Sequence, residues 1–74
     1  MNLYATPNPI ENTVRIEGAG TEHIARIHCL DLQGNYVKST NDLQMNLADC
    51  KPGVYFLRID LKKGNVIYLK IIKK

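Results

Sequence analysis

Long apolar runs and leader-like segments are missing from this 74-residue chain. No stretch of about 18 consecutive apolar residues exists, so the sequence predicts no membrane-spanning helix. The first four residues, Met1-Asn2-Leu3-Tyr4, have no basic start followed by an apolar stretch, so we expect no signal peptide. Two interpretations follow: the protein is cytoplasmic, or Met1 is a start placed before a piece of a longer protein.

Residues that carry out catalysis or bind metals are also scarce. His23 and His28 lie five residues apart, and two ligands do not make a zinc site. Cys29 and Cys50 form no CxxC motif, so we expect both to pack as small apolar residues; a disulfide between them stays open and would imply an oxidising compartment. Ser39 is the only serine and has no glycine elbow, and no Gly-rich phosphate loop occurs. We therefore expect no enzyme, no metal site and no cofactor.

Charge is divided unevenly along the chain. Residues 1–50 contain three basic and six acidic side chains, whereas residues 51–74 contain seven basic and one acidic. There is no tryptophan and only one phenylalanine, and the basic residues are not interleaved with aromatic side chains, so we do not expect nucleic-acid binding. Lysines that guard strand edges are the simpler explanation. The length allows a single domain, residues 1–74.

Apolar and polar residues alternate with a period of two almost everywhere, and no apolar stripe at helical spacing exists. In the third expected strand the alternation places Ala25, Ile27 and Cys29 on one face. In the last one it places Ile67, Leu69 and Ile71 together. The expected strands lie at residues 12–18, 23–31, 42–47, 54–61 and 66–74, with shorter ones at 36–38 and 3–6. The sequence therefore predicts an all-β, immunoglobulin-like Greek-key β-sandwich of about seven antiparallel strands.

The segments between these strands contain typical turn residues. Gly34 stands where a tight turn needs a positive φ, and Asp31 can accept hydrogen bonds from the amides that follow it. Gly64 begins a Gly-Asn hairpin turn, and Pro52-Gly53 fits the centre of a type II turn. Tyr55, two residues after that turn, has the position of a tyrosine corner, in which the hydroxyl bonds to upstream backbone.

Four segments in this order resemble a known family. They are TPNP at residues 6–9, IHCLDLQGNYV at 27–37, LADCKPGVYFLRI at 47–59, and the terminal GNVIYLKIIKK. Together they look like the type A C-terminal sorting domain of the type IX secretion system of Bacteroidetes, over essentially the whole chain. The residues that match the family motifs are Pro7, Asn8, Pro9, Asp31, Gly34, Gly53, Tyr55 and Gly64.

The sequence departs from the family pattern at several positions. Thr6 stands where an aromatic residue usually precedes Pro-Asn-Pro, and Asn35 replaces the usual lysine after Gly34. Cys29-Leu30 and Cys50-Lys51 also differ from the common residues. These are core-sized or surface substitutions, so they affect local packing more than the assignment.

The resemblance implies a passenger protein upstream of the domain. Such proteins reach the periplasm by a Sec signal, and the translocon, with its shuttle proteins, carries them through the outer membrane. A surface sortase then usually removes the domain, and the passenger is released or attached at the cell surface.

We place the recognition site on the terminal hairpin. The hypothesis is that Lys70, Lys73 and Lys74 at its tip dock on an acidic partner surface, where charge speeds the encounter. Val66, Tyr68 and Ile72 on the less buried face would add an apolar anchor, or a partner would extend the strand edge. The alternative is an ordinary core strand with lysine gatekeepers.

Two rival functions remain open. An adhesion or carbohydrate-binding module should display exposed aromatic side chains on one face, and this chain is poor in them. A structural or dimerisation module would form a weak homodimer through the basic terminal edge strand.

Overall fold

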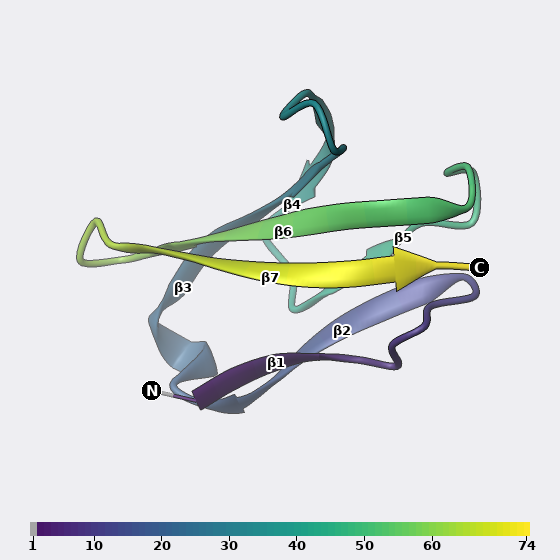
Figure 1. Cartoon of the computed structure of the whole chain (residues 1–74). Helices are drawn as coiled ribbons and strands as arrows, with labels where there is room; N and C mark the ends of the chain where they lie inside the picture. The colour runs from purple at the N-terminus through teal and green to yellow at the C-terminus, as the bar shows by residue number, and fades with distance from the viewer. Residues whose placement is uncertain (1) are drawn as a thin grey trace.

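Residues 2–74 fold into seven β-strands and one short 3-10 turn (Figure 1). A computed structural model describes residues 2–74. The elements are β1 (Asn2–Thr6), β2 (Thr13–Ala19), the 3-10 turn η1 (Thr21–His23), β3 (Ile24–Leu30), β4 (Tyr36–Thr40), β5 (Gln44–Asn46), β6 (Gly53–Leu61) and β7 (Val66–Lys73). Within the described residues, no helix is long and apolar enough to cross a membrane.

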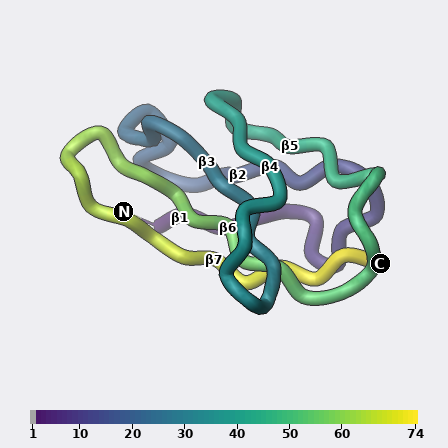
Figure 2. Tube along the Cα trace, turned by 90° about the horizontal axis from the view of Figure 1, so that it is seen from above, coloured from purple at the N-terminus to yellow at the C-terminus, as the bar shows by residue number. Residues whose placement is uncertain are grey.

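Two antiparallel sheets pack face to face. One has the order β1-β2-β5 and the other the order β4-β3-β6-β7. The chain crosses between the sheets after β2, after β4 and after β5, so β5 returns to pair with β2 and β6 returns to pair with β3. Figure 2 shows the two layers from above. The predicted all-β, immunoglobulin-like Greek-key β-sandwich is confirmed.

The core lies between the sheets, and every second residue of the strands points into it. Val14 and Ile16 of β2 are buried, as are Leu57 and Ile59 of β6. The other buried apolar residues are Leu3, Ile10, Ile24, Ile27, Cys29, Met45, Leu47, Tyr55 and Ile71. Ile10 comes from the loop after β1, so a loop as well as the strands closes the core.

The predicted inward face of β3 is wrong at one position. Ala25 is exposed, whereas Ile24 and Ile27 are both buried. The pairing of β3 with β6 shifts register between Ile24 and Arg26, and such an irregularity breaks the strict alternation of faces.

Tyr55 forms the predicted tyrosine corner. Its hydroxyl donates to the carbonyl oxygen of Lys51 at 2.6 Å, and the ring lies in the core. The predicted type II turn at Pro52-Gly53 is wrong, because Gly53 has a φ of 150° and is already paired with Lys73 as the first residue of β6. The Lys51 carbonyl that would close such a turn bonds to the tyrosine instead.

The turn after β3 follows the predicted chemistry. One carboxylate oxygen of Asp31 accepts the backbone amides of Gln33 at 3.0 Å and Asn35 at 2.9 Å. Gly34 has a φ of 86°, as the turn requires, and Gly64 has a φ of 101° in the β6–β7 hairpin. The hydrogen bond from the Asn35 amide is the main reason that the pKa of Asp31 lies below its ordinary value.

The Tyr55→Phe substitution tests the tyrosine corner. It removes one hydrogen bond and leaves the ring in place, so we expect the free energy of unfolding to fall by about 1 kcal/mol. Urea denaturation measures this change. Tyr68→Phe is the matched control, since Tyr68 is exposed and its hydroxyl has no hydrogen-bond partner within residues 2–74. An equal effect of the two substitutions contradicts the assignment.

The Asp31→Ala substitution tests the turn through pH. Because folding lowers the pKa of Asp31, its stabilising effect is complete above the ordinary value of 3.8 and disappears as the pH falls through the lower folded-state pKa. We therefore expect Asp31→Ala to unfold at a lower urea concentration than the parent at neutral pH. The difference between the two urea concentrations, which we call the gap, should narrow in acid. Asp42→Ala should give no such pattern, since the Asp42 carboxylate makes no hydrogen bond in the described chain. A gap that stays constant down to strong acid argues against the prediction.

Candidate docking surface on the terminal strand

The terminal strand β7 lies at the edge of the four-stranded sheet, and within residues 2–74 its only ladder partner is β6. Its even-numbered side chains point away from the core: Val66, Tyr68 and Ile72 are 42%, 56% and 44% exposed. Ile71 on the opposite face is fully buried. The prediction that Val66, Tyr68 and Ile72 lie on the less buried face of the strand is therefore confirmed.

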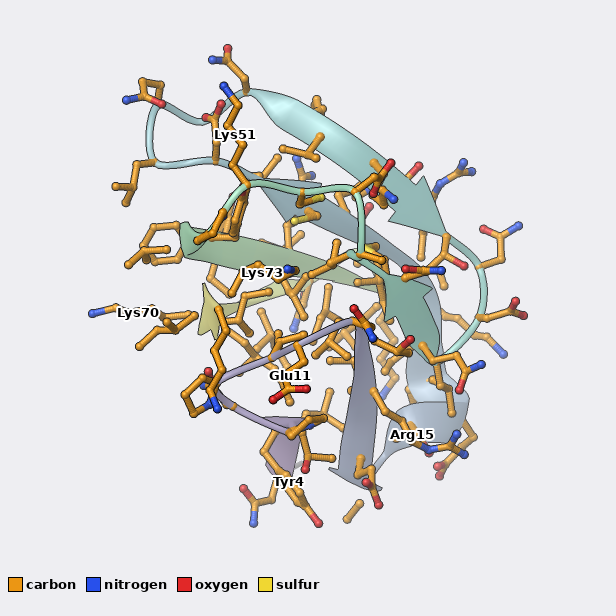
Figure 3. All side chains as sticks on the ribbon, turned by 90° about the vertical axis from the view of Figure 1, so that its right-hand side faces the viewer. Tyr4, Glu11, Arg15, Lys51, Lys70 and Lys73 are labelled. Atoms are coloured by element: carbon orange, nitrogen blue, oxygen red, sulfur yellow. The ribbon has the colours of Figure 1, made fainter. Side chains whose placement is uncertain are left out.

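Lys73 does not lie where the sequence hypothesis placed it. It is only 7% exposed, because it continues the inward-facing series of Ile67, Leu69 and Ile71. Its ammonium nitrogen donates to the carbonyl oxygen of Lys74 at 3.0 Å. In Figure 3 the side chain reaches into the end of the sandwich, whereas Lys70 projects to the side. Lys73 therefore belongs to the closure of the core rather than to a free surface.

The placement of the lysines at the hairpin tip is also wrong. The tip is formed by residues 62–65, between β6 and β7. Lys70 and Lys74 are exposed but lie toward the other end of β7, whereas Val66 is next to the tip. The six predicted recognition residues thus line a whole strand and do not form a single cluster.

A clamp made by the loop after β1 holds the end of β7. The side chain of Asn8 accepts the amide of Ile72 at 3.0 Å and donates to the carbonyl of Lys70 at 3.4 Å. The amide of Ile10 donates to the carbonyl of Ile72 at 2.7 Å, and the amide of Lys74 donates to the carbonyl of Ile10 at 2.8 Å. We call Asn8 and Ile10 the clamp. Within it, Ile10 forms an isolated parallel β-bridge with Lys73.

The clamp gives a physical role to a family motif. Asn8 is the middle residue of the Pro7-Asn8-Pro9 motif, for which the sequence suggested no contact. Ile10 was missed, although an apolar residue directly after Pro9 in an otherwise polar loop is a signal for burial.

The motif residues gather at one end of the molecule. We call this end the motif pole; it comprises residues 7–11, 31–38, 49–55 and 70–74. Gly53 pairs with Lys73 and Tyr55 with Ile71, while the turn at Asp31 follows the strand that pairs with the start of β6. Gly64 is the exception, since it lies in the hairpin at the far end. Figure 1 shows the start of β1 on the side opposite the C-terminus, which lies at the motif pole.

The motif pole carries more positive than negative charge. Lys74 pairs with Glu11 at 3.7 Å, whereas Lys51 and Lys70 have no ion pair within 4.0 Å among residues 2–74. The ammonium of Lys38 forms an ion pair with the carboxylate of Asp49 at 2.9 Å. This contact links β4, at the edge of the four-stranded sheet, to the loop that follows β5 of the other sheet. This contact lowers the pKa of the Asp49 carboxyl and raises that of Lys38. The free lysines are therefore the charges that a partner can meet.

The outer face of the four-stranded sheet carries a polar network. Asp60 accepts from Arg58 at 3.0 Å and contacts the ring nitrogen Nε2 of His28 at 2.9 Å. Arg58 also donates to the hydroxyl of Tyr36 at 3.0 Å, and the carboxylate of Asp60 raises the pKa of the guanidinium. These groups satisfy one another, as in cross-strand pairs that stabilise a sheet.

The cysteines are both free thiols. Cys29 is buried, and burial raises its pKa to about 11, so it is a poor source of thiolate. Cys50 is half-buried against the same core. Among the described residues no group of three His, Cys, Asp or Glu side chains could hold a metal ion.

Comparison with known proteins identifies a family. A family model described as the secretion system C-terminal sorting domain matches residues 3–74. No curated protein and no solved structure matches the chain. Since the matched segment spans both sheets, the clamp and β7, the chain belongs to the family of C-terminal sorting domains of the type IX secretion system.

Proposed function

We propose that the secretion machinery reads this domain in its folded form, through the outward face of β7 and the free lysines of the motif pole. Membership of the family makes the chain a C-terminal sorting signal that interacts with type IX secretion components and leads to export to the cell surface or medium. One observation supports the site best. The outward face of β7 is apolar and aromatic between its lysines, where the solvent face of a sandwich sheet is usually polar.

The charge around this face favours an acidic partner. Lys51 and Lys70 are exposed and unpaired in the described chain, and charges of this kind speed encounter and select partners more than they add affinity. Tyr68 and Ile72 then supply apolar area that a partner can bury. Lys74 contributes less, because Glu11 partly neutralises it.

The placement of the chain ends supports the route of a passenger. The start of β1 at Asn2 lies on the side away from the motif pole, so a passenger joined ahead of this strand would leave that pole accessible (Figure 1). We propose that such a passenger is carried from the periplasm through the outer membrane and that a sortase then removes this domain. The domain itself performs no catalytic step in this scheme.

Carbohydrate binding is a second candidate. Tyr36 and Tyr68 are 61% and 56% exposed and flank Arg58 on one face of the sheet, which suits stacking on sugar rings. If this face binds glycans, Tyr36→Ala abolishes retention on immobilised cell-envelope polysaccharide and leaves export unchanged. Equal retention of the parent and the variant eliminates this candidate.

An export assay tests the sorting site. The domain is fused behind an inert fluorescent protein that carries a Sec signal, in a bacterium with a type IX system, and fluorescence is measured in the medium and at the cell surface. We expect Lys70→Glu combined with Ile72→Ser to lower export roughly tenfold, which corresponds to about 1.4 kcal/mol of binding free energy. Both side chains are exposed, so the fold should persist.

Arg15→Glu is the matched control. It makes the same charge change on an exposed basic side chain of β2, in the other sheet, and we expect export to stay at the parent level. Urea denaturation of the variants excludes unfolding as the cause of any loss. Unchanged export of the Lys70→Glu, Ile72→Ser variant refutes the proposed site.

A further inference from the structure

We infer that the open part of the β7 edge, from Val66 to Lys70, binds an extended acidic segment of the secretion machinery as an added β-strand. This inference rests on the proposed function and goes further, because it assigns recognition to backbone hydrogen bonds. It also gives the partner segment a conformation, a length and a charge.

The clamp shows which backbone groups of β7 point away from β6, toward the open edge; we call these the outward groups. The amide and the carbonyl of Ile72 bond to Asn8 and Ile10, on the side away from β6. In an antiparallel pair, outward and inward backbone groups alternate along the strand. The amide and carbonyl groups of Tyr68 and Val66 therefore point to the same open side, together with the amide of Lys70.

These outward groups have no partner within residues 2–74. The backbone bonds that β7 makes outside its ladder with β6 all involve Ile72, Lys74 or the carbonyl of Lys70. The clamp thus closes the C-terminal end of the edge and stops at Lys70. An added strand can extend over about five residues, and Asn8 fixes where it must end.

This half of the edge has little of the usual protection against strand addition. Natural sheets protect their edges with lysines, bulges, prolines or inward-pointing charges. The opposite edge strand β4 has two of these features, an irregular register beside Leu30 and the inward-facing Lys38. Residues 66–70 have only Lys70, at one end, since β7 pairs with β6 without a register shift and its inward residues there are Ile67 and Leu69.

Charge selects the occupant. Lys70 lies at one end of the open edge, and the exposed Lys62 and Lys63 lie beyond the other. The single acidic residue of the hairpin, Asp60, is engaged by Arg58. A second copy of β7 carries no acidic side chain that could meet these lysines, so self-pairing is the poorer fit. An extended segment with Asp or Glu at both ends is the better one.

A proline substitution separates backbone recognition from side-chain recognition. Tyr68→Pro removes an outward amide that takes no part in the β6 ladder, and proline is tolerated on an edge strand in that orientation. Tyr68→Ala removes the same ring but keeps the amide. In the passenger export assay we expect Tyr68→Pro to lower export at least tenfold and Tyr68→Ala to lower it no more than about threefold.

Each outcome decides the inference. If Tyr68→Pro is exported as well as Tyr68→Ala, strand addition is overturned. An equal, large loss of export in both variants also overturns it, because recognition then depends on the tyrosine ring. That second result leaves the proposed function intact. The proposed function itself fails only if Lys70→Glu with Ile72→Ser is also exported normally.

A solution measurement covers the case in which the proline variant unfolds. The probe is a synthetic five-residue peptide of alternating valine and threonine with glutamate at both ends, titrated into the isotopically labelled chain. We expect slower hydrogen exchange at the amides of Val66 and Tyr68, and weaker binding when lysine replaces glutamate in the peptide. Lys70→Glu should reverse this preference. Absence of protection at these two amides at millimolar peptide overturns the inference.

Discussion

The architecture depends on the attachment of the last strand by the first loop. Asn8 and Ile10 bond to the end of β7 across more than 60 residues of sequence, and Ile10 is at the same time fully buried in the core. A domain of this size buries a small core, so the loss of one such closure is a large fraction of its stability. The motif that fixes the end of the signal therefore also stabilises the sandwich.

Three further contacts of the motif pole also hold loops and turns in place that the strand ladders do not fix. The hydroxyl of Tyr55 holds the loop that leads into β6, and Lys38 links the edge of one sheet to the loop after β5 in the other. The carboxylate of Asp31 orders the turn between β3 and β4. The motif residues Asp31 and Tyr55 thus have a structural role in closing one end of the sandwich.

The sequence was sufficient for the strands and for most of the turns, because a period of two and turn residues are local signals. It failed at Ala25, where the register between two strands decides which side chain is buried, and at Pro52-Gly53, where a distant hydroxyl competes for a carbonyl. The sequence hypothesis placed Lys73 on the surface because its side chain is charged, although the residue continues the inward-facing positions of β7. The clamp could not be predicted, since no local pattern pairs Asn8 with Ile72.

A signal assembled in this way exists only in the folded state. The open edge of β7 is regular because β6 pairs along its whole length without a register shift, and it ends at Lys70 because the clamp begins there. An unfolded chain presents the same lysines and apolar residues, but neither the aligned backbone groups nor their boundary. A partner that binds these groups therefore distinguishes a folded domain from an unfolded one.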